Sequence, residues 1–443
     1  MRALLFLLCA AFAAAAIDFS AIPDKSWAFC STAPGHVYGL SEVPWCYDPY
    51  HKKFVRIGGC TGGYTNEVYA YWFDGSGNFV SDQILAPGTT DNNRPGAGCS
   101  RGICYDTKRH LVWGLGGIGS PPIACSGTNN ALMGLDLADN SWQKAPGSTV
   151  NYFGACVQIE YGEDPDAVVM ITDGTGWHQC WVYEFSKSAW RQVATEWDPT
   201  KAGPKQGIFL AYKEMCYDPV NKLFVLYPGP GANPETWVFN PSTMTDWERR
   251  TPSPTPPFRE RYGMAYDSYN KKLILHGGWR GSWDVRVCMT DTWAYDAAAN
   301  TWTLISDAGA SRSAGGQTNF TPFEYDSEHN AFVGLCMNEE TGTWVYRLSS
   351  RGAAPEFSMP GPREVLSVFP NPFAARTQFS FPSPGTLSIF ALDGRLVESL
   401  GLTRSGKGFF AVWNARGRTP GCYIASVRAD KRNYSQRVEY LDK

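Results

Sequence analysis

Tryptophan and arginine side chains that stand close together in the chain offer the most evident chemistry in this sequence. Trp177 precedes His178, and Trp279 precedes Arg280, with Trp283 three residues further on. Flat aromatic rings stack on the apolar faces of sugars, and a guanidinium presents a planar fork of donors to hydroxyls or carboxylates. We expect such residues to bind a glycan or a protein ligand; the alternative is that the rings pack within their own loops. The full candidate set is Tyr64, Arg94, Trp177, His178, Trp197, Arg261, Trp279, Arg280 and Trp283, with Arg259 beside them.

Catalytic patterns are harder to find. Cleavage of a glycosidic bond by acid–base chemistry needs two carboxylates that face each other. Nothing in the sequence selects a pair among its loop carboxylates, which are Glu42, Asp91, Asp284, Asp291 and Glu339. The chain also lacks a glycine-rich phosphate loop, a His-x-x-His metal motif and a nucleophile elbow. The sequence therefore favours a binding protein with no cofactor and no metal, and an enzyme on polysaccharide, a lyase or a hydrolase, is the alternative.

The elements that must position these residues come from a repeated unit. Its clearest copy runs through Tyr266-Asp267, an apolar stretch that ends in Gly277-Gly278, Trp293-Ala294-Tyr295 and finally Trp302. A period of 50 to 60 residues with four short strands is typical of a propeller blade. The unit occurs six times, marked by Tyr47-Asp48, Tyr105-Asp106, Tyr161-Gly162, Tyr217-Asp218, Tyr266-Asp267 and Tyr325-Asp326. The sequence thus predicts an all-β fold, with a six-bladed β-propeller over residues 17–350.

The sixth copy has no tryptophan after Tyr346 to mark its fourth strand. The segment from Asp24 to Trp27 is similar to the segment from Asp139 to Trp142, which marks the fourth strand of the second copy. We therefore expect the Trp27 strand to complete the sixth blade and close the ring. Closure removes two free sheet edges, which are aggregation hazards.

The pattern of an apolar strand, Gly-Gly and a spaced aromatic and tryptophan resembles the kelch repeat family over roughly residues 20–350. The resemblance implies that the loops after the second strand and between blades gather over the central channel, where the candidate residues lie. Kelch propellers include both enzymes and plain binding modules.

Galactose oxidase, a copper radical oxidase, carries its site on such a propeller, and this site needs two histidines. The pattern instead places His51, His110 and His329 in hairpin turns on the opposite face, and His276 in the core. His178 is left as the one clear histidine of the loops. A copper radical oxidase is therefore disfavoured.

The chain begins as an exported protein would. Residues 1–16 contain Arg2, an apolar stretch and the Ala14-x-Ala16 pattern, which is typical of a secretory signal peptide. No later stretch is long and apolar enough to predict a transmembrane helix. The net charge of −3 in 443 residues gives no bulk attraction to nucleic acid.

Loss of the leader removes Cys9 and leaves twelve of the 13 cysteines. Cys46, Cys104 and Cys216 share one blade position, and we expect them to pack as small buried side chains rather than to form a metal cluster. Export permits disulfides, and the candidates are Cys60, Cys125, Cys180, Cys288 and Cys336.

A proline- and glycine-rich linker over residues 351–364 separates the propeller from a tail of different character. Residues 365–443 alternate as short strands around an Asp393-Gly394 turn, which predicts a small immunoglobulin-like β-sandwich. The Pro370-Asn371-Pro372 opening, Asp393-Gly394-Arg395 and Gly421-Cys422-Tyr423 resemble the C-terminal sorting domain of type IX secretion, although the middle motif is compressed. The resemblance implies that the type IX machinery is a partner and that the protein becomes attached to the bacterial cell surface. The alternative is a spacer with no sorting role.

Overall fold

The computed structural model divides the chain into two compact units, Met1–Gly352 and Ala353–Lys443. The residues that the structure describes are 16–32, 45–60, 64–86, 102–116, 130–150, 156–173, 178–193, 215–227, 234–259, 262–282, 285–307, 320–336, 342–349, 367–369, 376–381, 384–391, 395–405, 408–429 and 432–441. One short 3-10 helix, η1 (Phe19–Ala21), accompanies the strands of these segments. No helix among the described residues is long and apolar enough to cross a membrane.

Six four-stranded antiparallel sheets form the first unit, and each corresponds to one copy of the repeat. Blade one contains β2 (Trp45–Asp48), β3 (Lys53–Cys60), β4 (Tyr64–Phe73) and β5 (Phe79–Leu85). Blade two contains β6 (Gly102–Asp106), β7 (Leu111–Leu115), β8 (Met133–Asp136) and β9 (Ser141–Lys144). Blade three contains β10 (Cys156–Gly162), β11 (Ala167–Asp173), β12 (His178–Glu184) and β13 (Ala189–Gln192).

The remaining blades follow the same order along the chain. Blade four contains β14 (Met215–Asp218), β15 (Leu223–Leu226), β16 (Thr236–Phe239) and β17 (Glu248–Arg250). Blade five contains β18 (Gly263–Asp267), β19 (Lys272–His276), β22 (Thr292–Asp296) and β23 (Thr301–Ser306), with the hairpin β20 (Trp279–Ser282) and β21 (Val285–Cys288) inserted. Blade six contains β24 (Phe320–Asp326), β25 (Ala331–Cys336), β26 (Gly342–Arg347) and β1 (Ser26–Thr32).

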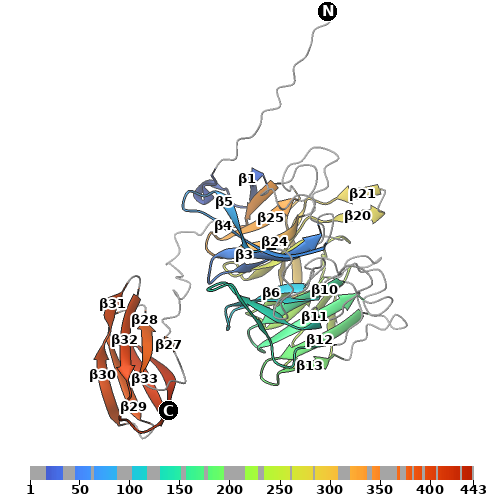
Figure 1. Ribbon diagram of the computed structural model, residues 1–443. Helices are drawn as coiled ribbons and strands as arrows, with labels where there is room; N and C mark the ends of the chain where they lie inside the picture. Colours follow the sequence, from blue (N-terminus) through green and yellow to red (C-terminus); the bar gives the residue numbers. More distant parts are fainter. Residues whose placement is uncertain are drawn as a thin grey trace, which may run out of the picture. The chain divides into compact units, whose positions relative to one another are not determined.

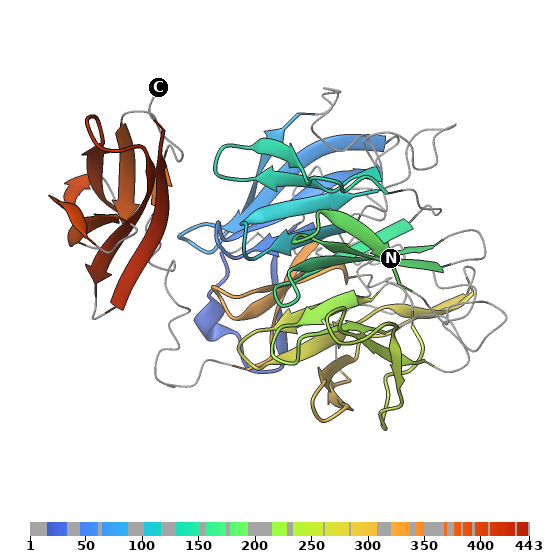
Figure 2. The ribbon, with the colours of Figure 1, turned by 90° about the horizontal axis from the view of Figure 1, so that it is seen from below.

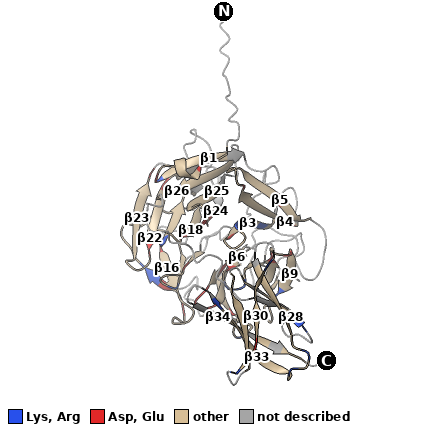
Figure 3. Cartoon of the chain, turned by 90° about the vertical axis from the view of Figure 1, so that its left-hand side faces the viewer, with Lys and Arg blue, Asp and Glu red and all other residues tan. Residues whose placement is uncertain are grey.

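The sheets are seen from the side in Figures 1 and 2, and Figure 3 shows them arranged as a ring around a common centre. The first strand of each blade contacts the first strand of the next, in the order β2, β6, β10, β14, β18, β24 and back to β2. Viewed from the side shown in Figure 3, β24 and β18 lie near the middle of the ring while β23 and β5 lie at its rim. The predicted fold of six four-stranded sheets is confirmed.

The N-terminal strand closes this ring as the sequence predicts. β1 pairs antiparallel with β26, so that Trp27 lies opposite Tyr346 and Phe29 lies opposite Trp344. The Trp27 ring lies 4.3 Å from the ring of His276 in blade five. This matches the other fourth strands, whose aromatic side chains pack against the preceding blade: Trp302 Nε1, for example, donates to Thr236 Oγ1 in blade four at 2.9 Å.

A hydrophobic cluster lies at each of the six junctions between neighbouring blades. At the closing junction, Trp45 and Phe54 of blade one pack with Val333 and Val345 of blade six. Full burial of such a side chain stabilises the fold by about 1.5 to 3 kcal/mol. The strands therefore bury both sheet faces, and the ends of the blades remain for function.

The second unit is a sandwich of two four-stranded sheets. The first contains β27 (Ser367–Phe369), β28 (Arg376–Phe381), β32 (Gly408–Asn414) and β31 (Thr403–Ser405), and the second contains β30 (Leu396–Gly401), β29 (Thr386–Ala391), β33 (Gly421–Ala429) and β34 (Arg432–Tyr440). Side chains of both sheets form one core, in which Phe379 and Trp413 meet Ile389 and Tyr423. The tail thus has its own hydrophobic core.

Candidate ligand-binding face

The two ends of the blades carry connections of very different length. At one end, the first and second strands of every blade are joined by four residues: 49–52, 107–110, 163–166, 219–222, 268–271 and 327–330. At the other end lie the connections from second to third strands and from blade to blade, and residues 193–214 form the longest of them. We call these ends the turn face and the loop face.

An aspartate fixes the turn in five of the six blades. In blade five, Asp267 Oδ1 accepts hydrogen bonds from the backbone N–H of Tyr269 at 2.9 Å and of Asn270 at 2.8 Å, while Oδ2 accepts from Asn270 Nδ2 at 2.7 Å. The fourth turn residue, Lys271, has a φ of 56°, a left-handed conformation that closes such tight turns. The aspartates with this arrangement are Asp48, Asp106, Asp218, Asp267 and Asp326.

The tyrosine before each turn reaches the preceding blade. Burial, and then the Asp48 carboxylate of blade one, raise the pKa of the Tyr105 hydroxyl in blade two. At the closing junction, burial and then Asp326 of blade six raise the pKa of Tyr47. In blade four, Tyr217 donates to the backbone oxygen of Asp164 at 2.7 Å. The Tyr-Asp repeat therefore links neighbouring blades on the turn face.

Histidines follow the placement that the sequence predicts. His51 and His329 lie in turns, where each Nδ1 is 2.6 Å from the turn aspartate, and His110 occupies the left-handed position of its turn. His276 is 1% exposed, and burial lowers its pKa to about 3. His51, His110 and His329 thus lie on the turn face, and His276 lies in the core at the end of β19.

The loop face of blade five holds the β20–β21 hairpin, which projects from the ring in Figure 1. Gly277 and Gly278 precede it with φ of 70° and 89°, a conformation that favours glycine. The backbone N–H of Met289 donates to Gly278 O at 2.8 Å, so the ladder continues into the hairpin.

A buried ion pair lies under this hairpin. Arg259 is 0% exposed, and its two terminal nitrogens each lie 2.7 Å from an oxygen of Asp291. Burial alone would raise the pKa of Asp291, but its hydrogen bonds and ion pair with Arg259 hold that pKa below its ordinary value. Two expectations are wrong here: Arg259 does not face a ligand, and Asp291 is not a solvated loop carboxylate, because each neutralises the other.

The nine candidate residues are placed only in part. Tyr64 begins β4, His178 begins β12, and Trp279 and Arg280 lie in β20, so the backbone of all four is at the loop-face end of a strand. The other five, Arg94, Trp177, Trp197, Arg261 and Trp283, lie outside the described residues, and their role in ligand binding stays a prediction.

Blade one carries a buried arginine that sequence reasoning missed. Arg56 is 1% exposed; its Nη2 donates to Glu67 Oε1 at 2.6 Å, and its guanidinium lies 4.6 Å from the centre of the Tyr69 ring. The signal was present, since a charged residue interrupts the apolar run Phe54-Val55-Arg56-Ile57. An arginine in such a run indicates a buried partner.

The cysteines of the first strands pack as expected. Cys46, Cys104 and Cys216 are at most 2% exposed and belong to three different junction clusters. Among the described residues, no three metal-ligating side chains gather. Cys180 corrects a disulfide prediction: it is a buried free thiol that accepts a hydrogen bond from Trp247 Nε1 at 3.3 Å, and burial raises its pKa to about 12. The side chains of Cys60, Cys125, Cys288 and Cys336 are not among those described.

Two further carboxylates stand on first strands. Glu160 and Glu324 occupy the position that Cys46, Cys104 and Cys216 hold in their blades, directly before the repeated tyrosine. They belong to blades three and six, which are opposite members of the ring. Glu42, Asp91, Asp284 and Glu339 lie outside the described residues.

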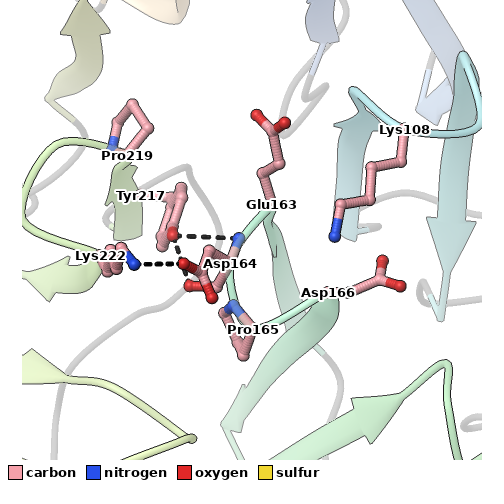
Figure 4. A pocket seen from close by; sticks show the side chains of 8 residues that line it. All are labelled: Lys108, Glu163, Asp164, Pro165, Asp166, Tyr217, Pro219 and Lys222. Carbon is pink, nitrogen blue, oxygen red and sulfur yellow. Dashed lines mark hydrogen bonds and ion pairs between the residues drawn. The ribbon is translucent and has the colours of Figure 1, made fainter.

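A shallow cavity of about 400 Å³ opens on the turn face (Figure 4). It lies where the repeat departs from its pattern, because blade three has Gly162 in place of the turn aspartate. A Cβ at Gly162 would lie 2.7 Å from the Phe224 ring, so only glycine fits. Most charged groups that line the cavity are neutralised by a partner: Lys222 pairs with Asp164, and Asp166 pairs with Arg109. The lining residues are Lys108, Glu163, Asp164, Pro165, Asp166, Tyr217, Pro219 and Lys222.

No protein-family model matches the chain, and no curated protein is similar to it. Among solved structures, the extracellular domain of a putative hybrid two-component system from B. thetaiotaomicron is similar with a TM-score of 0.43 and 11% identity, over 86% of this chain and 48% of that one. The chain thus spans about half the length of that protein. The SapL1 lectin in complex with α-methyl fucoside has a TM-score of 0.39 and 11% identity, over 69% and 97%. TolB from Acinetobacter baumannii has a TM-score of 0.35 and 9% identity, over 68% and 62%. The strand pairing, rather than these similarities, establishes the propeller fold.

Proposed function

We propose that the protein is an exported, cell-surface-attached propeller of the kelch type that binds a ligand, in the first instance a glycan, at its loop face. The asymmetry between the two faces carries the proposal. The turn face consists of six four-residue turns between first and second strands and of connections of four to eight residues between third and fourth strands, whereas the loop face has connections of up to 22 residues and the projecting β20–β21 hairpin. Long loops on a rigid scaffold are where binding residues concentrate.

The ligand chemistry follows from the composition of those connections. They contain Trp177, Trp197 and Trp283 together with Arg94 and Arg261. Aromatic rings stack on sugar rings, and each planar guanidinium donates to paired hydroxyl or carboxylate oxygens. A neutral or acidic polysaccharide suits this combination.

Binding is tested with the triple variant Trp177→Ala, Arg280→Ala, Trp283→Ala on columns of immobilised arabinoxylan, pectin and peptidoglycan. We expect the unchanged protein to be retained on at least one column and the variant to lose at least tenfold in retention. The matched control is Tyr50→Ala with Lys222→Ala, because both residues lie in turn-face turns and Tyr50 is 54% exposed. Equal retention of the triple variant and the unchanged protein would show that the loop face is not the binding face. Release of shortened glycan from a column would instead indicate an enzyme.

For export, we infer that residues 1–16 act as a signal peptide and that residues 365–443 act as a sorting domain for type IX secretion. The separate hydrophobic core of the tail supports a detachable role. Deletion of 365–443 should leave a folded propeller in the periplasm, as followed by cell fractionation with protease resistance as the folding control. Surface display of the truncated protein would refute the sorting role.

A further inference from the structure

The β20–β21 hairpin is an insertion into a regular blade. In the other blades, the connection from second to third strand holds no paired strands among the described residues. The hairpin follows directly from β19 and returns directly to β22. Within it, Trp279 pairs with Cys288 and Arg280 pairs with Val287, and Val287 is 48% exposed. A two-stranded hairpin of this size is at best marginally stable by itself, so its orientation must be fixed at its base.

Three segments meet at that base. Arg259 belongs to the connection that arrives from blade four, Gly277 precedes the hairpin, and Asp291 follows it. Arg259 Nη1 donates to Gly277 O at 3.0 Å, and its Nε donates to Pro257 O at 3.1 Å. The same guanidinium binds both carboxylate oxygens of Asp291. The Arg259 side chain therefore connects the segment before the hairpin with the segment after it.

The acceptor side of this arrangement is fixed as well. Trp293 Nε1 donates to Asp291 Oδ2 at 2.6 Å, and the backbone N–H of Gly277 donates to Asp291 O at 3.2 Å. Next to it, His276 Nδ1 lies 2.8 Å from Thr292 Oγ1. Asp291 is therefore held at its side chain and at its backbone, which leaves the ion pair little freedom to rearrange.

We propose that Arg259 and Asp291 are positioning residues that hold the β20–β21 hairpin, with Trp279 and Arg280, in a fixed orientation at the loop face. This rests on the proposed function. Buried ion pairs add little net stability compared with apolar residues of the same volume, and their best-attested use is to select one geometry. An ordered hairpin also avoids the entropy cost of fixing its side chains on binding, about 0.5 to 1.5 kcal/mol for each immobilised side chain.

The turn face supplies a second bidentate ion pair for comparison, whose side chains are more exposed, at 31% for Arg109 and 29% for Asp166. Arg109 binds both oxygens of Asp166, at 2.8 and 3.0 Å, between blades two and three. Its carboxylate also accepts from a second side chain, Tyr161, at 2.8 Å, as Asp291 accepts from Trp293. Neutralising either pair removes the same number of charges and the same bidentate contact, but only the loop-face pair lies under a hairpin.

The experiment compares two double variants, Arg259→Met with Asp291→Asn and Arg109→Met with Asp166→Asn. Changing both partners leaves no uncompensated charge at the loop-face pair. In the comparison variant, Asp106 loses its ion pair with Arg109 but keeps hydrogen bonds from two turn N–H groups and from Trp113 Nε1. Amide hydrogen exchange is measured on peptides that cover residues 279–288 and, separately, β19 and β22. We expect exchange in the hairpin to rise at least tenfold in the first variant and to stay within twofold in the second. The strands β19 and β22 should change little in both.

Several outcomes would overturn the proposal: unchanged exchange in the hairpin, an equal rise in both variants, or an equal rise in β19 and β22, which would mark the pair as a support of the whole blade. Retention on the arabinoxylan, pectin and peptidoglycan columns is the second readout, where the first variant should lose about tenfold and the comparison variant none. Because hydrogen exchange needs no ligand, its failure counts against the positioning role alone. Faster amide hydrogen exchange in the hairpin with unchanged retention on the columns would count against the hairpin as a binding element.

Discussion

The turn face and the loop face are built on the same strands, yet they obey different constraints. On the turn face, five aspartates each bind two backbone N–H groups of a four-residue turn, and tyrosines link one blade to the next. On the loop face, connection lengths range from the three residues 61–63 to the 22 residues 193–214. The polar groups of the turn face are thus engaged in holding the ring together, whereas the loop face is free to vary.

This difference teaches where function resides on a repeated scaffold. A residue that recurs in five of the six blades, such as the turn aspartate, meets a structural need that these blades share. A feature that, among the described residues, occurs in one blade, such as the β20–β21 hairpin with its buried Arg259–Asp291 pair, meets no such common need. Departures from the repeat are therefore the better guide to the site.

The largest effect on stability and binding is expected from opening the ring, because both faces are built on it. Deletion of residues 17–32 removes β1, so that blade six keeps three strands and the Trp27 contact with His276 is lost. We expect loss of cooperative unfolding and of ligand retention together. Urea denaturation followed by tryptophan emission tests this. A truncated protein with a single sharp transition at the original midpoint would show that the ring does not depend on its closing strand.

A turn-face change should lower stability without altering binding. Asp267→Ala removes an acceptor of three hydrogen bonds from a residue that is 1% exposed. Unsatisfied buried donors cost about 1 to 3 kcal/mol each when they cannot reach water; because part of this turn can reach solvent, we expect a loss of about 3 kcal/mol in the free energy of unfolding. Retention on the polysaccharide columns should be unchanged.

The matched control for this variant is Asp139→Ala. Asp139 Oδ1 also accepts from a turn N–H, that of Ser141 at 2.9 Å, but in an exposed turn between third and fourth strands. Its removal should leave the unfolding midpoint within error. A similar loss in both variants would mean that the recurring aspartate has no special structural role.

Much of the turn face could be predicted from the sequence because its physics is local. Tyr266-Asp267 followed by Ser268-Tyr269-Asn270 contains the acceptor, the turn residues and the capping amide within five positions. The closing strand could also be predicted, since the segment before Trp27 is similar to that before Trp142. Short-range hydrogen bonds and a repeated period leave few alternatives.

The loop face could not be predicted to the same depth, because its contacts join residues far apart in the chain. Arg259 and Asp291 are 32 positions apart, and nothing near either residue indicates the other. The neighbouring loop residues predict that Arg259 contacts the ligand, and the same reasoning predicts a disulfide for Cys180. Both turned out to be buried, because packing between segments, rather than local pattern, decides exposure there.

Adding a side chain where blade three departs from the repeat should destabilise the protein. Gly162 replaces the turn aspartate in blade three, and an added Cβ would lie 2.7 Å from the Phe224 ring and 3.0 Å from the Tyr217 ring. Phe224 is 0% exposed and cannot move aside without strain. Overpacking of this kind costs about 1 to 3 kcal/mol, so we expect Gly162→Ala to lose about 2 kcal/mol in chemical denaturation. An unchanged or higher stability would show that blade three tolerates a side chain at position 162 and that the glycine there has another cause.

The smallest predicted effect is a loss of stability at acidic pH that depends on His276, at the loop-face end of blade five. Burial lowers the pKa of His276 to about 3, whereas a histidine in the unfolded chain titrates near 6.5. Between these values the unfolded chain binds a proton that the folded protein does not, so the stability that is present above pH 6.5 falls as the pH decreases. The slope approaches about 1.4 kcal/mol per pH unit, which gives about 1 kcal/mol between pH 6.5 and 5.5.

His276→Asn keeps a side chain that can bond to Thr292 but removes the titration. The difference in unfolding free energy between the variant and the unchanged protein should therefore shrink as the pH falls through this window. A constant difference would mean that His276 is protonated within the fold, and the contact between its ring and Trp27 would then have to be regarded as a cation stacked on an aromatic ring rather than as apolar packing.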